Sequence, residues 1–177
     1  MTKHLALATA VVTLLLTTLT FAQTDKSKRP SPPGTAEVTL KGKKIIIEYS
    51  RPYLKGRHVG KELAPYGEVW RTGANEATSL VTETDLNIGG TKVPAGKYTI
   101  YSLPSEGTWK LIINKQTGQW GTEYKQDQDL ARIDMQKSAL AQPVEQFTIS
   151  FDKKSDTTAN LNLDWENNRL SVPVKAE

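Results

Sequence analysis

The sequence lacks cysteine and holds only two histidines, His4 and His58. Without cysteine there are no disulfides and no thiolate ligands, so zinc, copper or iron would depend mainly on carboxylates, which suit these metals poorly. A Ser-His-Asp triad could use only His58, because His4 lies at the N-terminus just before an apolar run, and no serine stands in a G-x-S-x-G motif. We therefore expect no metal and no cofactor.

An excess of charge of one sign is also absent. The chain has 23 Lys and Arg against 19 Asp and Glu, and the two signs are mixed along most of its length. Such mixing does not provide the basic surface that nucleic-acid binding requires. The uneven stretch Lys26-Ser27-Lys28-Arg29 is interpreted as a solvated leader, with attraction to an anionic surface as the alternative. We expect no nucleic-acid partner.

Long hydrophobic runs are missing except at the N-terminus. Lys3 and His4 precede an apolar run from Leu5 to Leu19, and Thr20-Phe21-Ala22 follows as a small-x-Ala pattern. Residues 1–22 are therefore predicted to be a secretory signal peptide, since the run is shorter than the roughly 20 residues of a membrane span. We expect a bacterial periplasmic or secreted protein without an integral membrane segment after cleavage, and the sequence does not indicate its oligomeric state.

Two further regions follow the predicted signal peptide. Residues 23–34 are rich in Pro and Lys and are predicted to be an extended linker. Residues 35–177 are predicted to form one domain, because apolar and polar residues alternate with a period of two in successive short segments. These segments lie at 38–40, 45–49, 77–86, 98–103, 109–113, 131–135, 147–151, 161–165 and 170–174, with a turn expected at Asn167-Asn168.

Eight or nine short strands with regular turn signals predict an all-β fold, either a two-layer antiparallel sandwich or a flattened barrel. The alternation breaks at residues 51–70, where Pro and Gly are too frequent for a regular element, and again at 116–128. A long irregular loop is uncommon within a compact domain and is often functional. We expect both segments at an end or edge of the sandwich.

The stretch from Tyr66 to Thr78 gathers an aromatic ring, a guanidinium, an amide and a carboxylate around Gly73. Guanidinium groups bind carboxylate or phosphate through paired hydrogen bonds, and aromatic rings offer flat apolar surface beside them. The sequence therefore predicts an exported, non-catalytic domain that binds a polar or anionic ligand such as a glycan, a cell-wall fragment or a small acid. The candidate binding residues are Arg51, Arg57, Trp70, Arg71, Asn75, Glu76 and Tyr101.

Three alternatives remain open at this point. The charged residues could be structural, with Glu68 or Glu76 paired to Arg71 or Arg51 and pinning the long loop. A glycan or cell-wall hydrolase could use Glu76 as acid or base with Glu68 or Glu62 as its partner, provided that the two carboxylates face each other across a cleft. The domain could also be an assembly component that associates through its sheet edges and has no small-molecule site.

Several motifs resemble one bacterial family. They are Tyr49-Ser50-Arg51-Pro52, Lys55-Gly56-Arg57, the string from Trp70 to Thr78 (W-R-T-G-A-N-E-A-T), Pro94-Ala95-Gly96-Lys97-Tyr98 and Trp120-Gly121. Together they resemble domain of unknown function 2911, from about Ser31 to the C-terminus. The resemblance implies an exported bacterial β-domain. It brings no established activity, substrate or catalytic residues.

Overall fold

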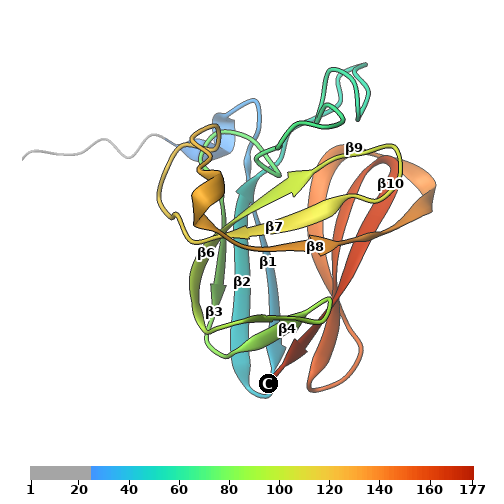
Figure 1. Ribbon diagram of the computed structural model, residues 1–177. Coiled ribbons are helices and arrows are strands. Elements are labelled where there is room, and N and C mark those ends of the chain that lie inside the picture. Colours follow the sequence, from blue (N-terminus) through green and yellow to red (C-terminus); the bar gives the residue numbers. More distant parts are fainter. Residues whose placement is uncertain (1–24) are drawn as a thin grey trace, which may run out of the picture.

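The computed structural model describes residues 25–177, so the predicted signal peptide lies outside the described residues. Two antiparallel sheets face each other (Figure 1), and neither closes into a barrel. This arrangement confirms the predicted all-β sandwich. The larger sheet has the order β1 (Pro33–Leu40), β2 (Lys43–Ser50), β3 (Thr78–Thr82), β6 (Gly96–Leu103), β7 (Lys110–Asn114) and β8 (Asp129–Asp134). The smaller has the order β5 (Thr91–Val93), β4 (Leu86–Ile88), β10 (Thr158–Ala176) and β9 (Gln136–Lys153).

Alternating burial along the strands explains why the two sheets pack together. In β1 every second residue from Ala36 to Leu40 is buried, and in β2 the residues Ile45 and Ile47 are fully buried. The opposing sheet contributes β10, including Leu163. Each fully buried side chain of this size stabilises the fold by about 1.5–3 kcal/mol. The core therefore lies between the sheets, as period-two patterning requires.

The C-terminal hairpin differs from the prediction. The turn expected at Asn167-Asn168 is absent, and β10 continues through both residues as one long strand paired with β9. The ladder accommodates irregularity through register shifts on either side of Glu166, which takes a positive φ of 53°. A β-bulge of this kind bends a strand without ending it.

Three irregular segments gather at the end of the sandwich away from the C-terminus (Figure 1). They are residues 51–70, residues 116–128 with the short 3-10 helix η2 (Gln126–Gln128), and residues 25–32 with η1 (Lys26–Lys28). The loop at 51–70 is anchored to the scaffold because the Leu54 N–H donates to the Glu145 carbonyl at 2.9 Å. The His58 ring nitrogen Nδ1 and the Glu166 carboxylate are 2.8 Å apart, a second anchor.

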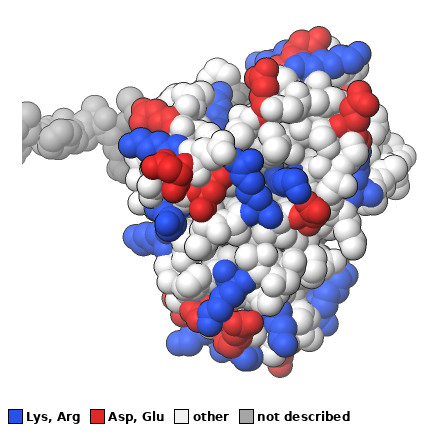
Figure 2. All heavy atoms as spheres, viewed as in Figure 1, with Lys and Arg blue, Asp and Glu red and all other residues white. Residues whose placement is uncertain are grey.

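The described surface carries both signs of charge. Figure 2 shows Lys and Arg interspersed with Asp and Glu on the face that it draws, without a large region of one sign of charge. Among residues 25–177, no helix has the length and apolar character needed to cross a membrane.

Candidate functional site

The string from Trp70 to Thr78 is held rigidly by its own polar groups. Trp70 exchanges two backbone hydrogen bonds with Ser102 of β6, at 2.8 and 2.9 Å. The Thr72 hydroxyl, which is fully buried, donates to Ser102 Oγ at 3.0 Å, and the Thr78 hydroxyl donates to the Thr72 carbonyl at 2.8 Å. Gly73 fits here because a Cβ would lie 2.9 Å from both the Ser50 carbonyl oxygen and Thr78 Oγ1.

The string contacts the second irregular segment, residues 116–128. The Ala77 N–H donates to the Gln119 carbonyl at 3.2 Å, and the Gly121 N–H donates to the Asn75 carbonyl at 3.0 Å. Gly121 also lies under the aliphatic part of Arg71, since a Cβ there would come within 2.6 Å of Arg71 Cδ. Residues 51–78 and 116–128 therefore build one region, which the sequence left undecided.

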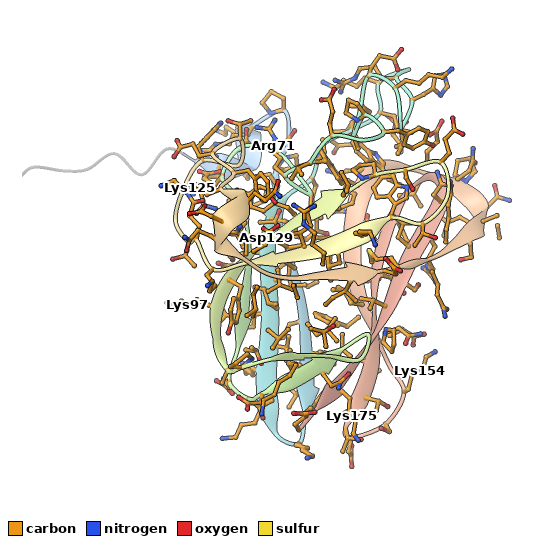
Figure 3. The ribbon with its side chains drawn as sticks, in the orientation of Figure 1. Arg71, Lys97, Lys125, Asp129, Lys154 and Lys175 are labelled. Carbon is orange, nitrogen blue, oxygen red and sulfur yellow. The ribbon has the colours of Figure 1, made fainter. Side chains whose placement is uncertain are left out.

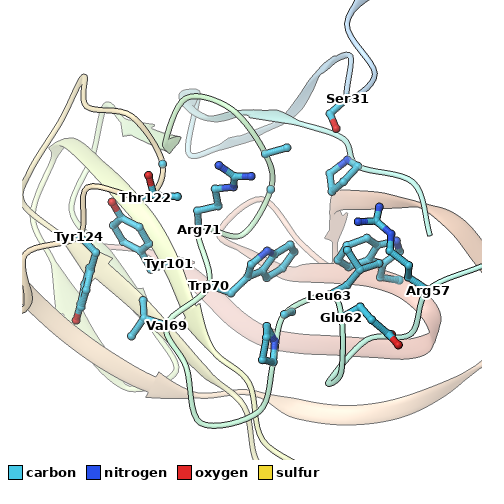
Figure 4. Close-up of a pocket in the computed structure, with 17 residues that line it drawn as sticks. Ser31, Arg57, Glu62, Leu63, Val69, Trp70, Arg71, Tyr101, Thr122 and Tyr124 are labelled. Atoms are coloured by element: carbon cyan, nitrogen blue, oxygen red, sulfur yellow. The ribbon is translucent and has the colours of Figure 1, made fainter. Parts of the chain in front are cut away.

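A cavity of about 460 Å³ opens between these segments, within the size range of small-molecule sites. Figure 4 shows Arg71 between the rings of Tyr101 and Trp70, with Arg57 on the far side of Trp70. Ser31, from the segment that precedes β1, completes the rim. Figure 3 places Arg71 at the same end of the sandwich as Lys125 and Asp129.

Arg71 is the unusual member of this string. Its side chain is half-buried and lines the cavity, yet it makes no hydrogen bond and no ion pair with any residue in the described part of the chain. Burial lowers the pKa of this guanidinium, because the charged form loses hydration. The structural alternative expected Glu68 or Glu76 to pair with Arg71 or Arg51, and no such pair occurs among residues 25–177.

Three more of the predicted binding residues line the cavity. Arg57 donates to the carbonyls of Leu54 and Tyr53, both at 3.0 Å, so its charge has hydrogen-bond acceptors but no carboxylate within ion-pair distance in the described chain. Trp70 stacks on Trp165, with ring centroids 5.3 Å apart. Tyr101 is buried, and its hydroxyl accepts from Gln119 Nε2 at 3.1 Å.

The other three predicted residues lie elsewhere and have structural partners. Arg51 donates to the Phe147 carbonyl at 3.3 Å and to Thr148 Oγ1 at 3.0 Å, which joins β2 to β9. Asn75 donates through Nδ2 to the Ser31 carbonyl at 3.2 Å and adopts a positive φ of 59°. The Glu76 carboxylate pairs with Arg29 and Lys26 instead of facing the cavity.

The Glu76 carboxylate is held by two cations. Arg29 Nη1 donates to both Glu76 oxygens at 2.9 and 2.8 Å, and Lys26 Nζ lies 3.1 Å from one of them. The Arg29 hydrogen bonds lower the pKa of Glu76 to about 2. A carboxylate with this pKa stays ionised near neutral pH, so it has no proton to donate and is a weak base.

The sequence did not single out several lining residues. Ser31 comes from the predicted linker, and Thr122 and Tyr124 come from the second irregular segment. Tyr124 donates to Asp129 Oδ2 at 2.6 Å and accepts from Arg132 Nη2 at 2.8 Å, and burial followed by the Asp129 contact raises its pKa to about 12. The one available signal was that an aromatic residue interrupts a polar loop.

Within residues 25–177, no cluster of three or more His, Asp or Glu side chains is arranged to hold a metal ion. No curated protein and no solved structure matches the chain. A family model does match, over residues 31–174, and confirms the resemblance drawn from the motifs. The chain therefore belongs to the family described as protein of unknown function (DUF2911).

Proposed function

We propose that this domain, exported to the periplasm or the cell exterior, binds a small anionic molecule in the Arg71 cavity without chemically changing it. The observation that carries the proposal is the contrast between Arg71 and its neighbours. Thr72, Asn75, Glu76 and Thr78 each have a protein partner for their polar side chain, whereas Arg71 has none among residues 25–177. A half-buried guanidinium without a partner costs free energy that an anionic ligand would recover.

The cavity chemistry supports a ligand with two parts. A carboxylate or phosphate would take the paired N–H donors of Arg71. The rest of the molecule would lie against Trp70 and Tyr101, whose rings suit the apolar face of a sugar or another flat body. Rigid neighbours keep Arg71 in place, because the Thr72 hydroxyl and Gly121 fix the backbone and the aliphatic stem.

The hydrolase alternative has less support. Two carboxylates across a cleft are needed for glycoside hydrolysis, separated by about 5–9.5 Å. Glu62 is the one carboxylate among the described residues that line the cavity, and it already accepts from the His58 N–H at 3.0 Å. Glu76 is ion-paired with Arg29 outside the cavity. These positions favour binding over hydrolysis.

The proposal is tested by thermal-shift measurements on the purified protein with matched anionic and neutral probes. Glucuronate is compared with glucose, N-acetylmuramate with N-acetylglucosamine, and inorganic phosphate with no addition. A probe at a hundredfold excess over its Kd stabilises the folded state by about 2.7 kcal/mol. For a chain of this size that is a rise in Tm of roughly 5–10 °C.

Two variants decide whether a shift belongs to the cavity. Arg71→Met keeps the aliphatic stem over Gly121 and removes the charge, so the shift should disappear. Lys175→Met removes the same charge from an exposed position at the opposite end of the sandwich (Figure 3) and should leave the shift intact. A shift that survives in Arg71→Met, or no shift with any anion, would overturn the proposal.

A further inference from the structure

The segment before β1 is fastened to the domain at three points. Arg29 and Lys26 hold Glu76, and the Ser31 carbonyl accepts from Asn75 Nδ2 at 3.2 Å. The Pro32 carbonyl then accepts from the backbone N–H at position 51 at 2.8 Å. Residues 25–32, named the strap from here on, therefore dock on the domain through Lys26, Arg29, Ser31 and Pro32.

The strap and Arg71 share one short piece of backbone. Gly73 and Ala74 line the cavity, and Asn75 and Glu76, which hold the strap, follow them directly. Ser31 of the strap also lines the cavity, and Figure 4 shows it across the loop from Arg71. Removing the strap would open one side of the cavity and would release the partners of two residues next to its wall.

We propose that the strap is a working part of the anion site and that Glu76 is a positioning residue, which acts by fastening the strap through Arg29 and Lys26. With Glu76 engaged, Ser31 completes the wall and the loop from Arg71 to Glu76 keeps the geometry that presents the guanidinium. This inference rests on the proposed function, because it describes how the same site is completed.

The ion pairs of Glu76 also affect the electrostatics of anion binding at Arg71. Arg29 and Lys26 together supply two positive charges to one carboxylate, so the carboxylate is engaged away from Arg71. Because Glu76 is paired, its carboxylate repels an anion bound at Arg71 less than an unpaired carboxylate would, although the two residues are only five positions apart in the same loop. Strap docking and anion binding should therefore favour each other, and such coupling is reciprocal.

Strap docking can be measured without any ligand, by limited trypsin digestion of the purified protein followed by mass spectrometry. Lys26 and Lys28 offer cleavage sites within the strap, and both side chains are exposed. Glu76→Gln keeps the side-chain shape and removes the charge, so cleavage at these two sites should become about tenfold faster, as expected from weakening one charge-assisted contact at a partly exposed position.

Glu37→Gln is the matched control for this experiment. Glu37 pairs with Lys44 at 3.5 Å, and its side chain is 45% exposed against 42% for Glu76. The control should leave cleavage in the strap unchanged. Unchanged cleavage in Glu76→Gln as well would show that the ion pair does not hold the strap and would overturn the inference.

Coupling is measured as the Kd of glucuronate and of inorganic phosphate by calorimetry, for the wild type, Glu76→Gln and Arg29→Gln. Both variants should weaken the binding of the probe by about tenfold. In turn, the probe should slow strap cleavage in the wild type but not in Arg71→Met.

The outcomes separate the two proposals. If neither probe nor the other anions bind the wild type, the proposed function fails. If a probe binds through Arg71 with the same Kd in Glu76→Gln although the strap is cleaved faster, the proposed function stands and the coupling inference is overturned. An equal effect of Glu37→Gln on the Kd would also overturn it, because a general loss of surface charge would then explain the result.

Discussion

Replacing Arg71 by methionine should make the ligand-free protein more stable. Most substitutions of a half-buried residue destabilise a fold, so the expected sign is unusual. It follows from the environment of Arg71, whose guanidinium has lost hydration without gaining a hydrogen bond or an ion pair among residues 25–177. Methionine retains an unbranched apolar stem over Gly121 and avoids the cost of the charge.

The size of the gain follows from the degree of burial. An unpaired charge in a deep interior costs several kcal/mol, but Arg71 is only half-buried and stays in contact with water. We expect a gain of about 1 kcal/mol in the free energy of unfolding. In a domain of this size that corresponds to a rise in Tm of about 2–4 °C.

The assay is urea unfolding of the wild type and Arg71→Met at pH 7, with Arg132→Met as the comparison. Arg132 donates to Asp129 at 2.9 Å and to the Tyr124 hydroxyl at 2.8 Å, so its loss should destabilise the fold by about 1–2 kcal/mol. If Arg71→Met loses as much stability as Arg132→Met, Arg71 is a structural residue. The missing partners of Arg71 would then not mark a binding site.

Three further results are expected. The folded-state pKa of Glu76 is about 2, below its ordinary 4.5, so the stability that its ion pairs contribute is present above pH 4.5 and is lost as the pH falls towards 2. The free energies of unfolding of Glu76→Gln and the wild type should therefore differ by about 1 kcal/mol at pH 7 and converge near pH 2. Gly73→Ala should lower the free energy of unfolding by about 2–3 kcal/mol, because a Cβ would meet two oxygens at 2.9 Å. Gly118→Ala is the control and should cost about 1 kcal/mol, because φ is also positive there but the space is open; thermal unfolding compares the two variants. Tyr124→Phe should lower the free energy of urea unfolding by about 1–2 kcal/mol, because its 2.6 Å hydrogen bond to Asp129 is lost, and a near-zero change would mean that this network does not fix the cavity wall.

The proposed site would trade stability for binding. Arg71 costs free energy in the empty protein, and Thr72 with Gly73 holds the backbone in a conformation that suits few sequences. Such trade-offs are common where a site is organised before its ligand arrives. A ligand that pairs with Arg71 would reverse the stability difference between the wild type and Arg71→Met, which links the stability experiment to the binding experiment.

The sequence predicted the strands better than their ends. Alternation along 45–49 and 170–174 corresponds to buried faces in β2 and β10, because the side-chain period of a strand is local and visible in any sequence. The turn at Asn167-Asn168 was wrong, since pairing with β9 carries β10 through residues that favour turns in isolation. Tertiary pairing overrides such preferences.

The candidate site shows the same contrast between what local sequence indicates and what tertiary contacts decide. Residue type drew attention to Arg57, Trp70, Arg71 and Tyr101, and these four side chains line one cavity. The same reasoning selected Arg51, although its guanidinium is occupied by contacts to β9 about a hundred positions away in the chain. The sequence around an arginine does not indicate whether a carbonyl or carboxylate far away in the chain will accept hydrogen bonds from its guanidinium.

The all-β fold and the family could be predicted from the sequence alone, because both depend on patterns among neighbouring residues. Which charges are paired became visible only in the folded chain. It brings Arg29 to Glu76 across 47 positions and passes the Arg71 stem over Gly121, so that one guanidinium faces a cavity with no partner in the described chain. Hydrogen bonding and ion pairing act over a few ångströms, and folding sets those distances between residues that are far apart in the chain.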